Sequence, residues 1–519
     1  MVKNNFGHGI ISFGGLKMEK LIAQYENIRR RMKAYTFANN LANWDSTTEA
    51  PKGCFENRSM QMGVLSEESY KLQTGPETVA VIDALFARRE ELDPILKHEI
   101  AERKEALDKI RKVPMNEFVD FMTLLGSSEH VWAQAKNASD WNQFLPLFEK
   151  ILTFQKKYVK YVETKDLKGY DVLLDEFEKG YTTKEYDKFF KVLKTDLVPF
   201  VKKVLAQDLH LDDSFSKQLF PTEGQKKFML HLQNVINFDK DHGLMKESEH
   251  PFTTNFGSCT DVRFTNHYYE NLFASSIFSA IHEMGHATYE MQVNPALDQT
   301  MSGNGGSMAL HESQSRFYEN IIGRSKEFWR VNLPALRKVF PKQLKGVTLE
   351  TFYKFVNRSQ ASLIRTEADE LTYPIHVMIR YDLERALFND EIAPADLPKA
   401  WNQKVKEYLG LEVPNDKEGV LQDVHWAWGY FGYFPTYALG SAYAAQIFAK
   451  MNSEFKVLKS LDSGSTKQIN EWLKDHLHQY GSTKYPKELF KGIAGANFDP
   501  KYYVKYLIKK YSKIYDLKS

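Results

Sequence analysis

The stretch LIAQYENIRRRMKAYTFANNLANW, residues 21–44, shows the pattern that decides the fold. Its apolar residues recur three or four positions apart, which places them on one face of an α-helix. The residues of this face are Leu21, Ile22, Tyr25, Ile28, Met32, Tyr35 and Leu41. The same spacing recurs along most of the chain, whereas clean two-residue alternation is scarce. We therefore expect an all-α protein.

The chain has no obvious internal boundary. Its 519 residues are enough for one large domain or for two or three ordinary ones. The charged stretch 88–112 is typical of a solvated helix with ion pairs between residues four apart. Two segments differ from their surroundings: 250–315 is rich in Gly, Ser, Thr, Asn and His, and 419–443 is rich in aromatic residues and Gly. Both compositions suit the lining of a cleft.

Charge and cysteine content narrow the class of function. The 69 Lys and Arg nearly cancel the 67 Asp and Glu, so no strong field would attract nucleic acid or an anionic membrane. Cys54 and Cys259 lie far apart, which argues against a disulfide framework and a thiolate metal site. No stretch approaches a signal peptide or the roughly 20 apolar residues that span a bilayer. We expect a cytoplasmic protein that acts on a small or neutral substrate.

A candidate metal site lies in FSAIHEMGHATYEM, residues 278–291. Histidines four positions apart on a helix lie on the same face, so His282 and His286 can bind one ion. Glu283 stands beside the first histidine, where it could act as general base for a water molecule. Gly285 would allow another backbone to approach closely. The alternative is a helix surface with two histidines and a solvated glutamate.

The third ligand is open at this stage. A catalytic zinc site needs about three protein ligands and one open position. One class of zinc protease has a Gly three residues and a His six residues beyond the motif, and Tyr289 and Gln292 exclude that class here. In the later stretch 308–322, Glu312 and Glu319 lie two turns apart on one helix face. Either carboxylate could reach the ion, and spacing alone does not choose between them.

Ordered motifs along the chain resemble those of the carboxypeptidase Taq family of metal-dependent carboxypeptidases. The motifs are HPF (250–252), DVRFT (261–265), HEMGH (282–286), HESQS (311–315), IRTEAD (364–369), GVLQDVHW (419–426) and GYFGYFPTYALG (429–440). A weaker match, WDSTTEAP at 44–51, has Ala50 where the family usually has Met. The resemblance begins at about Met18 and covers nearly the whole chain.

The resemblance implies a single helical domain, residues 18–519, with a deep central groove like that of gluzincins, preceded by a tail of residues 1–17. It implies Glu312 as the third ligand beside His282 and His286. It also implies one divalent ion, zinc first and cobalt as the alternative, and a homodimer. The substrates would be peptides with a free C-terminus, with a broad preference for the last residue.

A carboxypeptidase must recognise the terminal carboxylate beside the bond that it cuts, and the guanidinium fork of arginine suits this task. Arg263 and Arg365 both lie in motif-bearing segments. By resemblance, Arg365 is the first choice for the carboxylate clamp, whereas Arg263 would organise the site through an ion pair with an acid. The alternative for either arginine is a structural salt bridge.

Peptide hydrolysis builds negative charge on the carbonyl oxygen, which a hydrogen-bond donor can stabilise. His425 and Tyr437 are the candidate donors, and His250 is a candidate wall of the site. Candidate acceptors that orient histidines or hold arginines are Asp261, Asp369 and Asp423. The predicted product is one free C-terminal amino acid per cycle. The alternatives are a zinc endopeptidase with a similar cleft and a helical binding protein with an inactive site.

Overall fold

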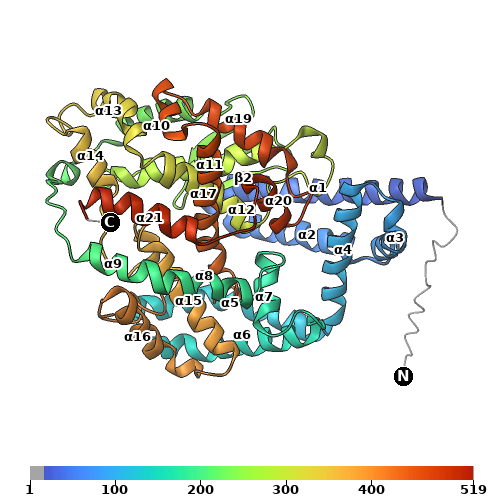
Figure 1. Ribbon diagram of the computed structural model, residues 1–519. Helices are drawn as coiled ribbons and strands as arrows, with labels where there is room; N and C mark the ends of the chain where they lie inside the picture. The colour runs from blue at the N-terminus through green and yellow to red at the C-terminus, as the bar shows by residue number, and fades with distance from the viewer. Residues whose placement is uncertain (1–16, 518–519) are drawn as a thin grey trace.

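The computed structural model describes residues 17–517, and it confirms the all-α prediction, because helices make up most of these residues (Figure 1). The predicted tail, residues 1–17, lies outside the described part of the chain except for Lys17.

The α-helices are α1 (Met18–Thr48), α2 (Phe55–Thr74), α3 (Pro76–Ala87), α4 (Pro94–Lys112), α5 (Met115–Ala138), α6 (Trp141–Val162), α7 (Tyr170–Phe177), α8 (Thr183–Val192), α9 (Val198–Leu205), α10 (Thr222–Ile236), α11 (Phe273–Met291), α12 (Met308–Arg316), α13 (Lys326–Val339), α14 (Leu349–Val356), α15 (Tyr373–Phe388), α16 (Leu397–Leu409), α17 (Phe434–Glu454), α18 (Val457–Ser460), α19 (Lys467–His476), α20 (Pro486–Ala494) and α21 (Lys501–Ile514). Short 3₁₀ turns are η1 (Lys52–Cys54), η2 (Arg89–Glu91), η4 (Ser214–Lys217), η5 (Pro295–Leu297), η7 (Arg365–Glu367), η8 (Pro394–Asp396), η9 (Leu461–Ser463) and η10 (His478–Tyr480). Two segments are π-helical, η3 (Leu193–Leu197) and η6 (Phe317–Ile322).

Helix α1 contains the whole of the stretch 21–44. Its residues Leu21, Tyr25 and Met32 are buried as the pattern predicts, whereas Leu41 is exposed. The buried face packs with α3 and α4 into a small hydrophobic core separate from the main one. Helix α1 is the long blue helix that extends toward the N-terminus in Figure 1. The chain therefore has a large core and a smaller, N-terminal one.

The charged stretch 88–112 has the predicted ion pairs between residues four apart, Lys104 with Asp108 and Glu105 with Lys109, but one of its faces is not solvated. Asp93 caps the helix by accepting hydrogen bonds from two backbone amides, and α4 begins only after it. Leu96 and Ile100 are buried against the helices of the small core. The prediction is wrong for this face because apolar residues four apart form a stripe within the charged sequence.

The three strands form one small sheet, in the order β1 (Gly243–Glu247), β3 (Val262–Asn266) and β2 (Thr253–Asn255). Strand β1 runs parallel to β3, and β2 runs antiparallel to it. Thr253 pairs with Phe264, and its hydroxyl bonds to Glu283, so this face of the sheet covers α11. Arg263 directly precedes Phe264 in β3, so its side chain points to the opposite face of the sheet.

Helices α11, α12 and α17 pack closely because glycines stand at their contacts. A Cβ atom added at Gly285 of α11 would lie 2.8 Å from the carbonyl oxygen of Gln314 on α12. A Cβ atom added at Gly440 of α17 would lie 2.7 Å from the Cβ atom of Glu312. Gly285 thus allows the close approach that the sequence predicts. Together the two contacts hold α12 between α11 and α17.

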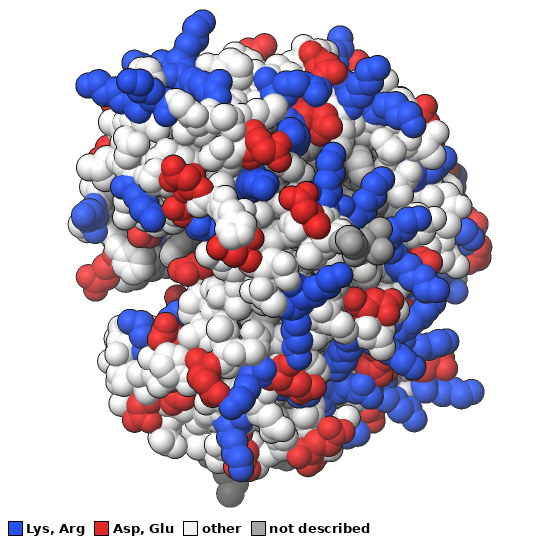
Figure 2. All heavy atoms as spheres, turned by 60° about the vertical axis from the view of Figure 1, so that its left-hand side comes forward, with Lys and Arg blue, Asp and Glu red and all other residues white. Residues whose placement is uncertain are grey.

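The surface carries no dominant charge on the face that Figure 2 shows, where blue and red side chains are interspersed. The same view shows a deep notch at the left edge, between an upper and a lower part of the molecule. Within residues 17–517, none of the helices combines the length and the apolar character that a membrane crossing requires.

Candidate metal centre and the neighbouring arginine cluster

Helices α11 and α12 bring three predicted residues together. The possible ligand atoms of His282, His286 and Glu312 all lie within 4.8 Å of one another. Oε2 of Glu312 lies 3.7 Å from Nε2 of each histidine. The two imidazole rings are nearly perpendicular, at 80°, with their centroids 4.9 Å apart. In the described part of the chain, these three residues form the group whose spacing fits a metal ion.

The second candidate carboxylate, Glu319, occupies a different position. It lies in the π-helix η6, which continues α12, and its Oε2 is 3.0 Å from Nδ1 of His282. Burial alone would raise the pKa of Glu319, but the charge of Arg316 and the bond to His282 hold it well below its usual value. An ionised carboxylate only accepts hydrogen bonds, so the proton of His282 lies on Nδ1. In the neutral ring, this leaves the Nε2 lone pair on the side of Glu312.

A second relay orients His286. Its Nδ1 bonds to Nδ1 of His311, whose Nε2 lies 2.7 Å from Oε1 of Glu290. In the tautomer that leaves Nε2 of His286 for a metal ion, His286 donates from Nδ1 to His311, and His311 donates from Nε2 to the carboxylate. Burial and the nearby His311 hold the pKa of His286 well below its usual value, so this ring is neutral. That tautomer places the Nε2 lone pair of His286 on the side of Glu312.

Glu283 is buried between α11 and the edge strand β2. Thr253 Oγ1 donates a hydrogen bond of 2.6 Å to its Oε2. Burial raises the pKa of Glu283 above its usual value. A carboxylate with a raised pKa is a better proton acceptor near neutral pH, which suits a general base.

Arg365, in η7, belongs to a second cluster and is almost fully buried. Its Nε and Nη2 donate to Oδ1 of Asp423 at 3.1 and 2.8 Å. Arg380 of α15 donates from Nε to Oδ2 of the same aspartate at 2.7 Å. Burial would raise the pKa of Asp423, but the two arginines hold it far below its usual value. Two arginines thus share one carboxylate, which leaves this arginine cluster positively charged.

His425 and Tyr437 complete the arginine cluster. Nε2 of His425 lies 3.2 Å from the hydroxyl of Tyr437, and the guanidinium of Arg365 lies 5.0 Å from the centre of the Tyr437 ring. Nδ1 of His425 is buried without a hydrogen-bond partner among the described residues. Burial, together with Arg365, lowers the pKa of His425 to about 3. The imidazole is therefore neutral at physiological pH, with one nitrogen available.

Tyr373, at the start of α15, connects the two clusters. Its hydroxyl accepts a hydrogen bond of 3.1 Å from Nη1 of Arg365. The guanidinium of Arg316 lies over the Tyr373 ring, 4.4 Å from the ring centre. Arg316 in turn donates from Nε to Oε1 of Glu312 at 2.6 Å. The predicted carboxylate clamp and the predicted metal ligand are thus separated by one tyrosine and one arginine.

Other predicted site residues lie outside both clusters. Arg263 binds Asp261 through Nε and Nη2, at 2.7 and 2.8 Å, and its guanidinium lies 4.1 Å from the centre of the Phe256 ring. His250 is exposed in the segment between β1 and β2. Asp369 accepts hydrogen bonds from backbone amides on both sides of η7 and so holds that loop.

Sequence reasoning missed several residues of this region, namely His311, Glu290, Arg316, Tyr373 and Arg380. Three of them carried a local signal. His311 adjoins Glu312 in the motif HESQS, Glu290 follows His286 by four residues, and Arg316 follows Glu312 by four. Tyr373 and Arg380 carried none, because their partners lie on other segments of the chain.

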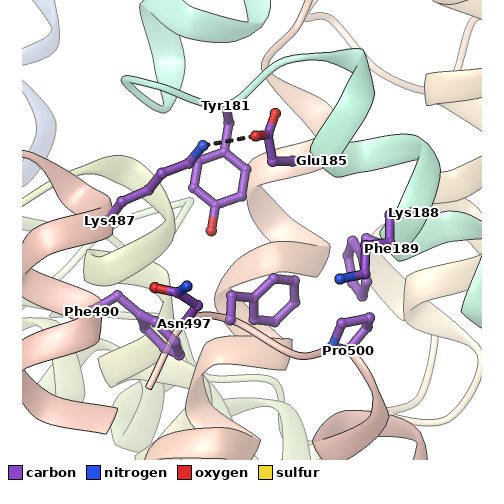
Figure 3. A pocket seen from close by; sticks show the side chains of 9 residues that line it. Tyr181, Glu185, Lys188, Phe189, Lys487, Phe490, Asn497 and Pro500 are labelled. Carbon is purple, nitrogen blue, oxygen red and sulfur yellow. Dashed lines mark hydrogen bonds and ion pairs between the residues drawn. The ribbon is translucent and has the colours of Figure 1, made fainter. Parts of the chain in front are cut away.

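A cavity of about 250 Å³ lies elsewhere, between α8, α20 and the segment before α21 (Figure 3). Its lining consists of Tyr181, Glu185, Lys188, Phe189, Lys487, Phe490, Asn497, Phe498 and Pro500. Lys487 bonds to Glu185 at 2.8 Å, so two of its charges neutralise each other. None of the residues that line this cavity belongs to either cluster. The candidate site is therefore at the clusters, not here.

A mostly helical protein with an H-E-x-x-H helix packed against a carboxylate-bearing helix has the features of a metallopeptidase. Comparison with known proteins narrows this class. The family model described as carboxypeptidase Taq (M32) metallopeptidase matches residues 24–511. Carboxypeptidase 1 of Bacillus subtilis is 40% identical over 493 residues, which are 95% of this chain and 98% of that protein. Thermostable carboxypeptidase 1 of Thermus thermophilus is 35% identical over 507 residues, 95% of this chain and 99% of that protein.

Solved structures agree with these matches. The M32 carboxypeptidase of Deinococcus radiodurans superposes with a TM-score of 0.91 and 30% identity, over 96% of this chain and 100% of that one. The chain belongs to the carboxypeptidase Taq family. Its activity is that of a metal-dependent carboxypeptidase, a peptide hydrolase that removes C-terminal amino acids.

Proposed function

We propose that His282, His286 and Glu312 hold one divalent metal ion, with zinc as first choice and cobalt as the alternative. Two imidazole nitrogens and one carboxylate oxygen suit a catalytic zinc site, and other first-row ions compete for the same donors. The observation that carries this proposal is that Nε2 of each histidine lies 3.7 Å from the same oxygen of Glu312. When bound, the ion would polarise the last peptide carbonyl and make a water molecule more acidic.

Glu283 would be the general base. Thr253 fixes its Oε2, which leaves Oε1 for proton transfer. Its raised pKa favours it as acceptor of a proton from water, which it would then pass to the leaving amine.

Arg365 would anchor the terminal carboxylate of the peptide. Asp423 occupies the Nε and Nη2 side of its guanidinium, and Tyr373 accepts from Nη1. The end formed by Nη1 and Nη2 still has N–H groups for a second carboxylate. The positive charge that remains after Asp423 is shared with Arg380 favours an anion at this position.

His425 and Tyr437 are the proposed donors to the negative charge that develops on the carbonyl oxygen. Because the neutral imidazole has one proton, the bond between the two residues leaves one of them at a time free to donate. The unpartnered Nδ1 of His425 supports this role. Arg263 would act indirectly, because its ion pair with Asp261 braces the sheet whose edge strand carries Thr253. His250, in the loop that precedes that strand, would form part of the outer wall of the site.

The working unit that we propose is residues 18–519 as one domain, assembled as a homodimer in the cytoplasm and acting on peptides of broad C-terminal sequence. The family match over residues 24–511 supports one unit. The near balance of charge gives no reason to expect nucleic acid or a membrane as partner.

The test of the clamp offers one peptide sequence with a free and with an amidated C-terminus. We expect cleavage of the free acid and little of the amide. Arg365→Met should lower kcat/KM for the free acid by about 10- to 100-fold, since a hydrogen bond to a charged group is lost. Arg358→Met removes an arginine that pairs with Asp213 away from both clusters, and it serves as the matched control. Equal cleavage of both peptides by the natural chain would instead favour an endopeptidase.

A further inference from the structure

The two carboxylate oxygens of Glu312 have different neighbours. Oε2 faces Nε2 of both proposed histidine ligands and accepts one hydrogen bond, 3.0 Å from Ser315 Oγ. Oε1 accepts the 2.6 Å hydrogen bond from Nε of Arg316. One oxygen is thus turned toward the proposed ion, and the other is held by an arginine.

Arg316 is itself fixed, so it cannot easily release Oε1. Its Nη1 donates to Oε2 of Glu319 at 3.2 Å, and its guanidinium lies over the Tyr373 ring. Glu319 is held in turn by His282 and by Nη2 of Arg324, at 3.0 and 3.1 Å. The guanidinium is therefore held from three sides in a half-buried position.

A catalytic zinc site with three protein ligands keeps at least one position open for water and the peptide carbonyl. A carboxylate that bound through both oxygens would occupy such a position. A charge-assisted hydrogen bond to Oε1 disfavours this, because the positive guanidinium beside that oxygen repels the ion.

We propose that Arg316 is a positioning residue that confines Glu312 to coordination through Oε2 alone and so keeps the reactive position open. This inference rests on the proposed ligand set. It makes Arg316 a determinant of coordination number, and hence of which first-row ion the site prefers.

The test uses the full-length chain loaded with cobalt(II), whose visible absorption weakens as its coordination number rises. Arg316→Met should retain one cobalt per chain, absorb more weakly than the natural chain, and lose about 10- to 100-fold in kcat with a smaller change in KM. Arg324→Met is the matched control: it removes the same charge and one bond to Glu319 but leaves Oε1 of Glu312 held. Its spectrum should equal that of the natural chain. Arg316→Lys keeps a donor for Oε1 and should recover part of the absorption.

An unchanged spectrum in Arg316→Met with cobalt bound would overturn the inference, as would loss of the ion from a folded variant. Equal weakening in Arg324→Met would also overturn it, because charge alone would then explain the change. If Arg316→Met does not fold, Arg316→Gln is measured by the same criteria. Glu312→Ala separates this result from the ligand assignment: if that variant binds cobalt as tightly as the natural chain, the proposed ligand set fails first.

Discussion

The residues around the candidate metal site, here called the metal cluster, are brought together in the opposite way from those of the arginine cluster. In the metal cluster, His282, Glu283 and His286 lie within two turns of α11, so helical spacing alone brings them together. In the arginine cluster, Arg365, Asp423 and Tyr437 come from η7, from the loop before α17, and from α17 itself. The first arrangement is written in consecutive residues, whereas the second exists only after the chain has folded.

The two clusters also differ in charge. Carboxylates dominate the first, where Glu283, Glu312 and Glu319 surround the histidines, and this suits a cation. Arginines dominate the second, where Arg365 and Arg380 share Asp423, and this suits an anion. A peptide end has its polarised carbonyl close to its carboxylate, so two adjacent clusters of opposite preference match its chemistry.

Glu283→Gln should impair the metal cluster and leave the arginine cluster intact. We expect kcat to fall by roughly 10²- to 10⁴-fold, because the amide cannot accept the proton, while metal content and KM for the free-acid peptide stay near those of the natural chain. Thr253→Val removes the hydrogen bond that fixes Oε2 of Glu283 and should lower kcat about 10-fold. Steady-state kinetics and metal analysis of both variants check this. Full turnover in Glu283→Gln would remove its proposed role.

One buried glutamate braces each cluster, which allows a comparison by pH. Glu178 accepts hydrogen bonds from Ser307 and Ala309 at the start of α12. Glu384 accepts them from Trp426, Tyr170 and Gly432. Burial raises the pKa of each carboxyl to about 7. Between about pH 4.5 and pH 7 the folded chain therefore keeps a proton that the unfolded chain loses, and stability falls as pH rises.

Glu178→Gln and Glu384→Gln should each reduce this loss of stability, by up to about 3 kcal/mol over the pH window, because the amide does not titrate. Urea unfolding at pH 5, 6, 7 and 8 measures the slopes. We expect metal affinity to change mainly in Glu178→Gln, and recognition of the free C-terminus to change mainly in Glu384→Gln. This result would show that the two clusters are supported separately. Slopes parallel to that of the natural chain would show that neither acid keeps its proton.

Gly440→Ala tests whether α17 holds the two clusters in register. Its new Cβ would meet the side chain of Glu312 at 2.7 Å, while Tyr437 lies one turn earlier on the same helix. We expect a loss of about 1–3 kcal/mol in stability and weaker metal binding. Gly492→Ala in α20 meets nothing within 4 Å and should be neutral or slightly stabilising. Thermal unfolding and metal titration of both variants decide it, and equal effects would exclude a steric cause.

The same difference between nearby and distant residues explains which features could be predicted from the sequence. Helical periodicity predicted the fold class, and the spacing of His282 and His286 predicted a shared face, because both depend on residues a few positions apart. Spacing alone left the choice between Glu312 and Glu319 open, because it depends on how two helices pack, and the family resemblance was needed to name Glu312. The short sheet was missed because its strands have three to five residues, too few for alternation to stand out. Asp423 was a candidate to hold an arginine, but local pattern could not show that it holds both Arg365 and Arg380.

Segment η6 carries more residues per turn than the α-helix that it continues, and Glu319 depends on this for its direction. Deleting one residue between Arg316 and Glu319 would let the segment relax toward an α-helix and change the direction of Glu319 around the helix axis. His282 would then lose its hydrogen-bond acceptor although every side chain of the site remained encoded. At this point the loss of one codon would be as damaging as a missense change in the site itself, and a descendant of this chain could become inactive with all its motifs intact.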